Sequence, residues 1–192
     1  VVTEPFGLAD ANFFQVFDWP FTAGTAASAL ADPASLVVTE SFARRYFGNA
    51  SPLGRAITLT VEGHPTAYHV SAVLRDLPAT SEFNREGNVR IHALARLVYT
   101  PTDYPQWAHW GSEQLFTFLR FPTAAAAHAF ERGLPAFIDR RGAKDSGGES
   151  FTRIMHQALL PVPAMHLREA SDRATVTTLG LVGALALLIA VV

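Results

Sequence analysis

Apolar residues follow distinct patterns along the chain, and each pattern predicts a different element. Residues 35–39 (Ser-Leu-Val-Val-Thr) form a short apolar run rich in β-branched side chains, which is typical of a buried strand. Residues 55–61 and 66–74 alternate between apolar and polar positions, and a turn containing glycine and proline separates them. This alternation predicts two antiparallel strands, each with one buried face.

A helical pattern follows directly after the first of these strands, in residues 40–47. Thr39 is predicted to cap this helix, and Gly48 is placed to end it in the left-handed conformation. Arg44 and Arg45, in the last turn, suit the helix dipole. They could also hold a phosphate or a lipid headgroup, although a solvated helix end is the commoner role of such a pair. The predicted buried stripe consists of Phe42, Ala43, Tyr46 and Phe47.

The first part of the chain has shorter elements. Residues 1–6 are predicted to end a strand, and residues 10–17 to form a short helix with Asp10 as its N-cap. Residues 21–24 are predicted to be a turn, and residues 26–30 a single helical turn. The apolar face of the short helix, which we interpret as core rather than as a ligand site, consists of Phe13, Phe14 and Phe17.

The second half of the chain is less regular. Residues 89–99 suit either a helix or an irregular strand, and residues 115–121 are a strand by residue type. Residues 124–132 are predicted to be a helix that the following glycine and proline interrupt. Residues 151–160 are apolar enough for a last strand. This irregular mixture of strands and helices predicts an α+β fold, a mixed α/β domain.

The chain ends in a long apolar run. No residue after Arg173 is charged, and residues 179–192 are all apolar or glycine. A surface helix would need a polar face, and glycine is commoner in membrane helices than in soluble ones. We therefore expect residues 175–192 to begin a transmembrane helix that continues beyond residue 192, and we expect the sequence to start inside a longer protein. The alternative is a buried terminal helix of a soluble domain.

Composition narrows the possible functions. The chain has 192 residues, enough for one domain or one domain of two lobes with a sizeable core. Its formal net charge is −2, with basic and acidic residues mixed, so the basic stripe expected of a nucleic-acid-binding protein is missing. It contains no cysteine, which excludes disulfides, thiolate catalysis and cysteine-ligated zinc.

Motifs of catalysis are also missing from the sequence. It has no phosphate-binding loop, no dinucleotide fingerprint, no zinc-protease motif and no nucleophile elbow. The histidines lack metal-ligand spacing, so we predict no catalytic, cofactor-binding or metal-binding residues. Trp107 and Trp110 could form an aromatic ligand patch, but such a pair more often fills a core or an edge. The seven histidines are His64, His69, His92, His109, His128, His156 and His166.

Three segments carry a resemblance to a known family: DANFFQVFDWPFTAG at 10–24, SLVVTESFARRYFGNASPLGRAITL at 35–59, and YHVSAVLRDLPATS at 68–81. Together they resemble the MacB-like periplasmic core domain of FtsX-family ABC transporter permeases. The similarity is strongest over residues 10–78 and weak over residues 79–150. Its motifs are structural, so they specify a fold and not a cargo.

The resemblance implies a domain layout and a set of partners. Residues 1–174 would be an extracytoplasmic core domain with a main lobe at about 1–78 and 115–174 and a variable lobe at about 79–114. Residues 175–192 would then start the second transmembrane helix. The implied partners are an ABC ATPase subunit or domain, a second permease in a homodimer or heterodimer, the membrane, and a periplasmic adaptor or cargo, with no nucleic acid.

Two functions from different classes follow. The first is a non-catalytic permease domain, without a cofactor, that faces the periplasm or the extracellular side of a bacterial inner membrane. It would couple ATP-driven motion of the membrane helices to export of peptide, macrolide or lipoprotein cargo, or to an extracytoplasmic partner such as a hydrolase. The second is a membrane-tethered or soluble enzyme whose site is assembled from scattered His, Asp and Ser residues.

Overall fold

The structure is a computed structural model, and it divides the chain into two compact units that are described separately below. We call residues up to 98 together with 115–120 the sheet unit, and residues 121–165 the helical unit. The residues that the structure describes are 4–61, 63–79, 81, 83–84, 91–98, 115–143, 147–153 and 156–165. The predicted lobe boundaries stay a prediction.

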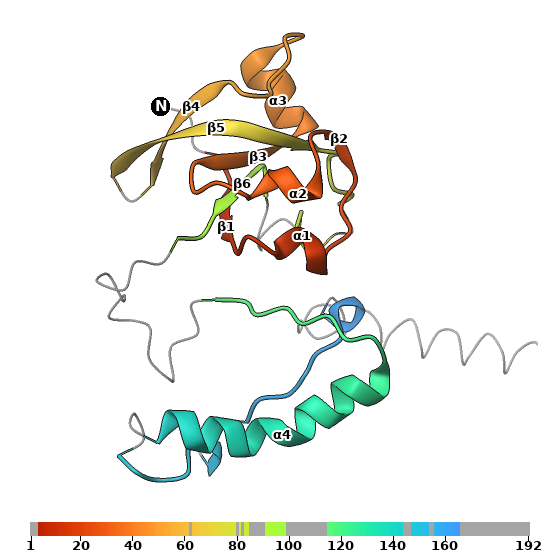
Figure 1. Cartoon of the computed structure of the whole chain (residues 1–192), viewed down its shortest axis with the longest axis vertical. Helices are drawn as coiled ribbons and strands as arrows, with labels where there is room; N and C mark the ends of the chain where they lie inside the picture. Colours follow the sequence, from red (N-terminus) through yellow and green to blue (C-terminus); the bar gives the residue numbers. More distant parts are fainter. Residues whose placement is uncertain are drawn as a thin grey trace, which may run out of the picture. The chain divides into compact units, whose positions relative to one another are not determined.

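The sheet unit contains a six-stranded mixed sheet (Figure 1). Its strands are β1 (Phe6–Ala9), β2 (Phe21–Ala23), β3 (Ser35–Thr39), β4 (Ala56–Val61), β5 (His64–Leu74) and β6 (Ala93–Arg96). Neighbours follow the order β1-β6-β3-β5-β2, and β4 pairs with β5 beside this path. β5 is the longest strand and joins three others, β3 in parallel and β2 and β4 in antiparallel orientation. β1 pairs in parallel with β6 at one edge of the sheet.

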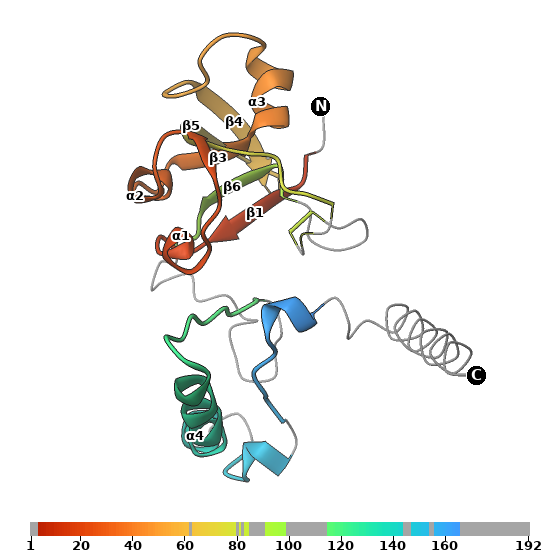
Figure 2. The same cartoon turned by 90° about the vertical axis from the view of Figure 1, so that its right-hand side faces the viewer.

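Apolar side chains fill both faces of this sheet. Successive residues of a strand point to opposite faces, so Leu36 and Val38 lie on one face and Val37 on the other. The face with Val37 is covered by α1 (Phe13–Val16) and α2 (Ala26–Ala29), and the opposite face by α3 (Glu40–Phe47), as Figures 1 and 2 show. Because helices cover both faces, all five residues of β3 are buried.

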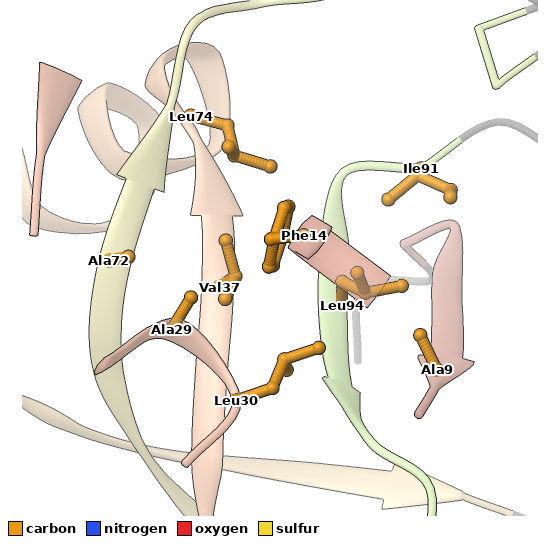
Figure 3. Close-up of a cluster of buried hydrophobic side chains, with 9 residues drawn as sticks. All are labelled: Ala9, Phe14, Ala29, Leu30, Val37, Ala72, Leu74, Ile91 and Leu94. Atoms are coloured by element: carbon orange, nitrogen blue, oxygen red, sulfur yellow. The ribbon is translucent and has the colours of Figure 1, made fainter. Parts of the chain in front are cut away.

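Each face has its own cluster of buried side chains. The first, drawn in Figure 3, consists of Ala9, Phe14, Ala29, Leu30, Val37, Ala72, Leu74, Ile91 and Leu94. The second, under α3, consists of Leu36, Val38, Phe42, Ala43, Val70, Val73, Ala93 and Ala95. At roughly 1.5–3 kcal/mol for each large apolar side chain removed from water, these two clusters are the main source of stability in the sheet unit.

The predicted strand, helix and hairpin between residues 35 and 74 are confirmed. Oγ1 of Thr39 accepts a hydrogen bond from the backbone N–H of Phe42 (3.4 Å), as a helix cap does. Two details differ. Gly48 has a positive φ of 60°, but its ψ of −126° lies outside the left-handed helical region. Tyr46 is 38% exposed because its hydroxyl turns toward the segment before β1.

The short N-terminal helix is real, but it starts later than predicted. α1 begins at Phe13, and the residue in the capping position is Asn12, without a side-chain cap. Asp10 contributes its backbone carbonyl instead, which accepts a hydrogen bond from the N–H of Phe13 (3.0 Å). The strand expected to end within residues 1–6 begins at Phe6, because its pairing partner β6 sets its position.

Residues 21–24 were predicted to be a turn, and this prediction is wrong for the first three. Phe21 and Ala23 pair with Leu74 and Val73, so β2 adds an antiparallel strand to β5. Gly24 follows with φ 78°, and a Cβ at this position would lie 2.7 Å from the backbone oxygen of Ser71. The glycine therefore permits both the turn and the close approach to β5.

Two further expectations depended on strand partners. The ambiguous residues 89–99 contain strand β6, which pairs with β1 and β3. Residues 115–121 form no strand, and the prediction of one is wrong, since no described strand pairs with them. The segment is held by side chains instead: Phe118 packs against Phe17, and the guanidinium of Arg120 donates to the backbone oxygen of Gln15 (3.1 Å).

The helical unit is built on α4 (Ala124–Gly142), which continues through Gly133 and Pro135. The predicted interruption is therefore wrong. A proline costs one backbone hydrogen bond and some steric strain, and the alanine-rich turns before it favour the helix strongly. Oγ1 of Thr123 caps the helix by accepting from the N–H of Ala126 (3.2 Å).

The predicted last strand at 151–160 is also wrong. Its described residues form a 3₁₀ turn, η1 (Phe151–Arg153), followed by an irregular segment, and a second turn, η2 (Val162–Ala164), comes next. Phe151 is 6% exposed and lies against Gly142, where a Cβ would come within 3.0 Å of the ring. The last turn of α4 thus provides the surface on which η1 packs.

Residues 175–192, Trp107 and Trp110 lie outside the described residues, so the expectations for them stay predictions. None of the helices in the described part of the chain combines the length and the apolar character needed to cross a bilayer.

Candidate functional site

Glu4 stands at the centre of a polar cluster just before β1. Its Oε1 accepts hydrogen bonds from the Arg45 guanidinium and from the Tyr46 hydroxyl (2.8 Å), and its Oε2 lies 2.7 Å from Nδ1 of His92. The Glu4 side chain is only 9% exposed, against 56% for Arg45 and 24% for His92. We call these four residues the Glu4 cluster.

The electrostatics of the cluster favour a charged carboxylate. Burial by itself would raise the pKa of Glu4, but hydrogen bonds with His92, Tyr46 and Arg45, together with the Arg45 charge, outweigh burial and lower it. The hydrogen bond with Glu4 raises the pKa of Arg45, and burial, reinforced by Glu4, raises the pKa of Tyr46. At neutral pH, Glu4 is therefore an ionised acceptor whose partners are already in place.

Backbone hydrogen bonds at His92 also connect the elements that carry the Glu4 cluster. Arg45 and Tyr46 lie in the last turn of α3, and His92 directly precedes β6. The N–H of His92 donates to the backbone oxygen of Pro5 (3.1 Å), and its carbonyl accepts from the N–H of Thr39 (3.0 Å). The end of β3, the start of β6 and the segment before β1 thus meet at His92.

A second carboxylate holds the other end of α3. Oδ1 of Asp76 accepts from the backbone N–H of Ser41 (2.9 Å), and Oδ2 pairs with the Arg44 guanidinium (3.1 Å). Burial raises the pKa of Asp76, but the hydrogen bonds from Ser41 and the nearby charge of Arg44 outweigh it and lower the pKa. Asp76 lies two residues after β5, so it fastens α3 to the end of that strand.

The two arginines that could have formed an anion site are therefore both engaged by carboxylates of the chain itself. Arg44 pairs with Asp76, and Arg45 pairs with Glu4. Both arginine side chains remain more than half exposed. The sequence signal located the arginines correctly but not their partners, which lie 32 and 41 residues away along the chain.

Half-buried aromatic rings form a second cluster in the sheet unit, beside α1. Phe17 has its ring centroid 5.0 Å from that of Phe83 and 4.9 Å from that of Phe118, and Trp19 lies 5.1 Å from Phe83. These edge-to-face distances are favourable for aromatic pairs. Phe116, beside Phe118, is 70% exposed. Of the three phenylalanines predicted to form the apolar face of the short helix, Phe14 is buried in the core. Phe13 and Phe17 are half-buried and belong to this aromatic cluster.

The histidines that the structure describes show no arrangement typical of a metal centre. His64 and His69 lie on β5 five residues apart, so their side chains point to opposite faces of the sheet. His128 and His156 are exposed, and the prediction for His109 and His166 falls outside the described residues. Among the residues that the structure describes, no three His, Asp or Glu side chains gather in one place.

The helical unit contains one cluster of Asp, Ser and Thr. Asp139 of α4 accepts hydrogen bonds from the hydroxyl of Ser150 (3.0 Å) and from the backbone N–H and hydroxyl of Thr152 (2.9 and 3.1 Å). The hydrogen bond from the Thr152 N–H, aided by Ser150, lowers the pKa of Asp139. These contacts fasten η1 to α4. They join the carboxylate to hydroxyl and amide donors rather than to the imidazole that a catalytic triad requires.

Sequence reasoning did not find Glu4 or Asp76. Both are single acidic residues in ordinary segments, and their partners come together only through the sheet. One weak signal existed for Glu4, which is a charged residue within the otherwise uncharged first nine residues. What the geometry supports is attachment of elements to one another, because the hydrogen bonds to Glu4 and Asp76 come from α3 and from His92 beside β6.

The fold and these clusters define a mixed α/β domain in which charged side chains connect helix α3 to the strands around it. A family model for the MacB-like periplasmic core domain matches residues 3–136. The chain therefore belongs to the family of MacB-like periplasmic core domains, which are parts of ABC transporter permeases. None of the curated proteins matches its sequence.

Two solved structures are similar to the chain. One is a domain of a protein assigned as a permease from Porphyromonas gingivalis, with 21% identity, a TM-score of 0.47 and coverage of 70% of this chain and 53% of that one. The other is the periplasmic region of MacB from Actinobacillus actinomycetemcomitans, with 23% identity, a TM-score of 0.26 and coverage of 44% and 42%. The chain thus spans about half the length of each structure.

Proposed function

We propose that this chain is the extracytoplasmic domain of an ABC transporter permease and that it couples ATP-driven motion of the membrane helices to an extracytoplasmic step. The observation that carries the proposal is the family match over residues 3–136. The step would be export of a peptide, macrolide or lipoprotein cargo, or action on an extracytoplasmic partner such as a hydrolase. The domain itself would be non-catalytic.

The physical character of the sheet unit supports this role. Helices cover both faces of its sheet, and carboxylates fasten α3 at both ends. A close-packed unit of this kind transmits a displacement because its interior resists compression. The sequence lacks a phosphate-binding loop, which supports an ATPase on a separate domain or chain.

The remaining features of the proposal come from the family and the sequence. Residues 1–174 would form the extracytoplasmic core domain, with its variable lobe at about 79–114, and residues 175–192 would begin a transmembrane helix. The permease would act as a homodimer or heterodimer in the bacterial inner membrane, with the domain on the periplasmic or extracellular side. A periplasmic adaptor or the cargo would be its further partner.

A topology experiment on the intact parent protein tests the proposal. A reporter enzyme that is active only outside the cytoplasm is inserted between Gly147 and Gly148, two exposed residues that follow α4. The proposal expects an active reporter, with the same reporter on the ATPase inactive as a matched control. An inactive reporter at this position, together with an intact folded fusion, would overturn the proposal.

A further inference from the structure

We propose that Glu4 is a mechanical clasp, fastening the segment that leads into β1 to α3 and β6 so that displacement of this segment moves the sheet unit as one body. This inference rests on the proposed function, since it names the contact through which the motion would reach the domain. It concerns a positioning residue and requires no ligand.

The first reason is the number of separate elements that Glu4 joins. One oxygen is bonded to Arg45 and Tyr46 on α3, and the other lies 2.7 Å from His92, which precedes β6. Hydrogen bonds to a charged group are about twice as strong as neutral ones, and the low exposure of Glu4 protects them from water. A surface ion pair with both partners exposed would contribute little.

The second reason is where the cluster lies relative to the strand pairing. β1 is an edge strand, and its ladder with β6 covers only four residue pairs, starting at Phe6 and Ala93. Glu4 and Pro5 come before this ladder. The Pro5 carbonyl accepts a hydrogen bond from the His92 N–H. A displacement of the chain before Glu4 therefore acts on the Glu4 side chain and on this backbone bond before it acts on the hydrogen bonds between β1 and β6.

The third reason is that α3 is well anchored beyond the clasp. Phe42 and Ala43 of α3 are buried against the sheet, and Oγ1 of Thr39 caps its first turn. A force that Glu4 transmits to Arg45 and Tyr46 therefore acts on the apolar cluster under α3. The short pairing of β1 with β6 alone would transmit the force only to the edge of the sheet.

The experiment uses the intact permease with its ATPase in lipid nanodiscs. This domain has no cysteine, so Thr58→Cys, on the exposed face of β4, takes a single fluorophore once any cysteines elsewhere in the parent are removed. Energy transfer from this fluorophore to acceptor lipids is measured with and without ATP, and the ATPase rate is measured in parallel. Glu4→Gln removes the charge, Tyr46→Phe removes one hydrogen bond, and Asp76→Asn is the matched control at the opposite end of α3.

If the clasp operates, Glu4→Gln reduces the ATP-dependent change in energy transfer by at least half, Tyr46→Phe reduces it less, and Asp76→Asn leaves it unchanged, with all ATPase rates within about twofold of the parent. Equal effects of Glu4→Gln and Asp76→Asn would show a merely structural role of both carboxylates and would overturn the inference. So would a full response in Glu4→Gln.

The failure of the proposed function looks different. In that case the unsubstituted protein shows no ATP-dependent change in energy transfer, and the clasp inference fails with it. Hydrogen exchange at the His92 amide is the second measurement. The clasp inference requires faster exchange at this amide in Glu4→Gln than in Asp76→Asn, and equal rates would count against it even if transport were unaffected.

Discussion

The sheet unit and the helical unit are stabilised in different ways. In the sheet unit, residues far apart along the chain pair into one sheet, and two apolar clusters cover its faces. In the helical unit, α4 has 19 residues, yet only Ile138 and Gly142 are buried within it. The first unit therefore depends on tertiary burial, whereas α4 depends much more on its own backbone hydrogen bonds, its alanine content and its cap at Thr123.

This difference shows which substitutions each unit tolerates. A buried side chain in the sheet contacts several strands, so its removal leaves a cavity that the structure cannot easily close. A side chain on α4 affects mainly the local helix. We therefore expect its removal to lower the free energy of unfolding much less than the removal of a buried side chain in the sheet unit. The following predictions test this contrast, starting with the largest effect.

Leu94→Ala is expected to lower the free energy of unfolding by about 3 kcal/mol, because large-to-small changes in a core typically cost roughly 2–5 kcal/mol. Leu94 is 2% exposed and belongs to the first apolar cluster (Figure 3). Phe130→Ala in α4, where the side chain is 44% exposed, should cost less than about 1 kcal/mol. Urea denaturation measures both, and equal losses would contradict the contrast between the two units.

Gly24→Ala is expected to cost about 2–3 kcal/mol. Its φ of 78° disfavours any side chain, and the new Cβ would also clash with the backbone of β5. Gly54→Ala is the matched control, since its φ is 75° but nothing lies within 4 Å of its Cβ position. The control should cost only about 1–2 kcal/mol. Similar losses for the two variants would show that backbone strain, and not contact with β5, explains Gly24.

Glu4→Gln is expected to make the stability of the sheet unit less sensitive to acid. The native pKa of Glu4 is lower than that of an unfolded glutamate, about 4.3, so its contribution is fully present above that pH and is lost as pH falls through the lower native pKa. The variant should lose about 1 kcal/mol less than the unsubstituted chain between about pH 5 and pH 3. Asp76, whose pKa is also lowered, keeps part of the acid sensitivity of the sheet unit. Parallel pH profiles for the two proteins would contradict this prediction.

Two glycines of α4 should respond in opposite directions to the same substitution. Gly133→Ala places a Cβ in open space and should stabilise the helix by about 0.5–1 kcal/mol. Gly142→Ala places a Cβ within about 3.0–3.2 Å of Phe151 and should cost about 1 kcal/mol by pushing η1 away. Hydrogen exchange of α4 and near-ultraviolet circular dichroism measure the two effects. Stabilisation by both variants would show that η1 is not packed tightly against the helix.

Elements with strong local signals were predictable from the sequence, and so was the family. The buried strand before Thr39, its cap, α3 and the β4–β5 hairpin depend on β-branched runs, alternation and turn residues that act within a few positions of one another. The prediction of the family rested on the same segments, and the match over residues 3–136 confirms it.

Tertiary structure decided the rest. Residues 21–23 became a strand because β5 offered an open edge, whereas residues 115–121, which have the composition of a strand, found no described partner for a ladder. In the same way, the Glu4 cluster required the sheet to bring together α3, His92 and the start of the chain. The sequence by itself determined the elements whose caps, turns and alternating side chains act within a few residues. The tertiary structure decided the elements whose hydrogen-bond partners lie tens of residues away. Every buried backbone N–H and C=O needs a partner, but the local sequence does not specify which distant group that partner is.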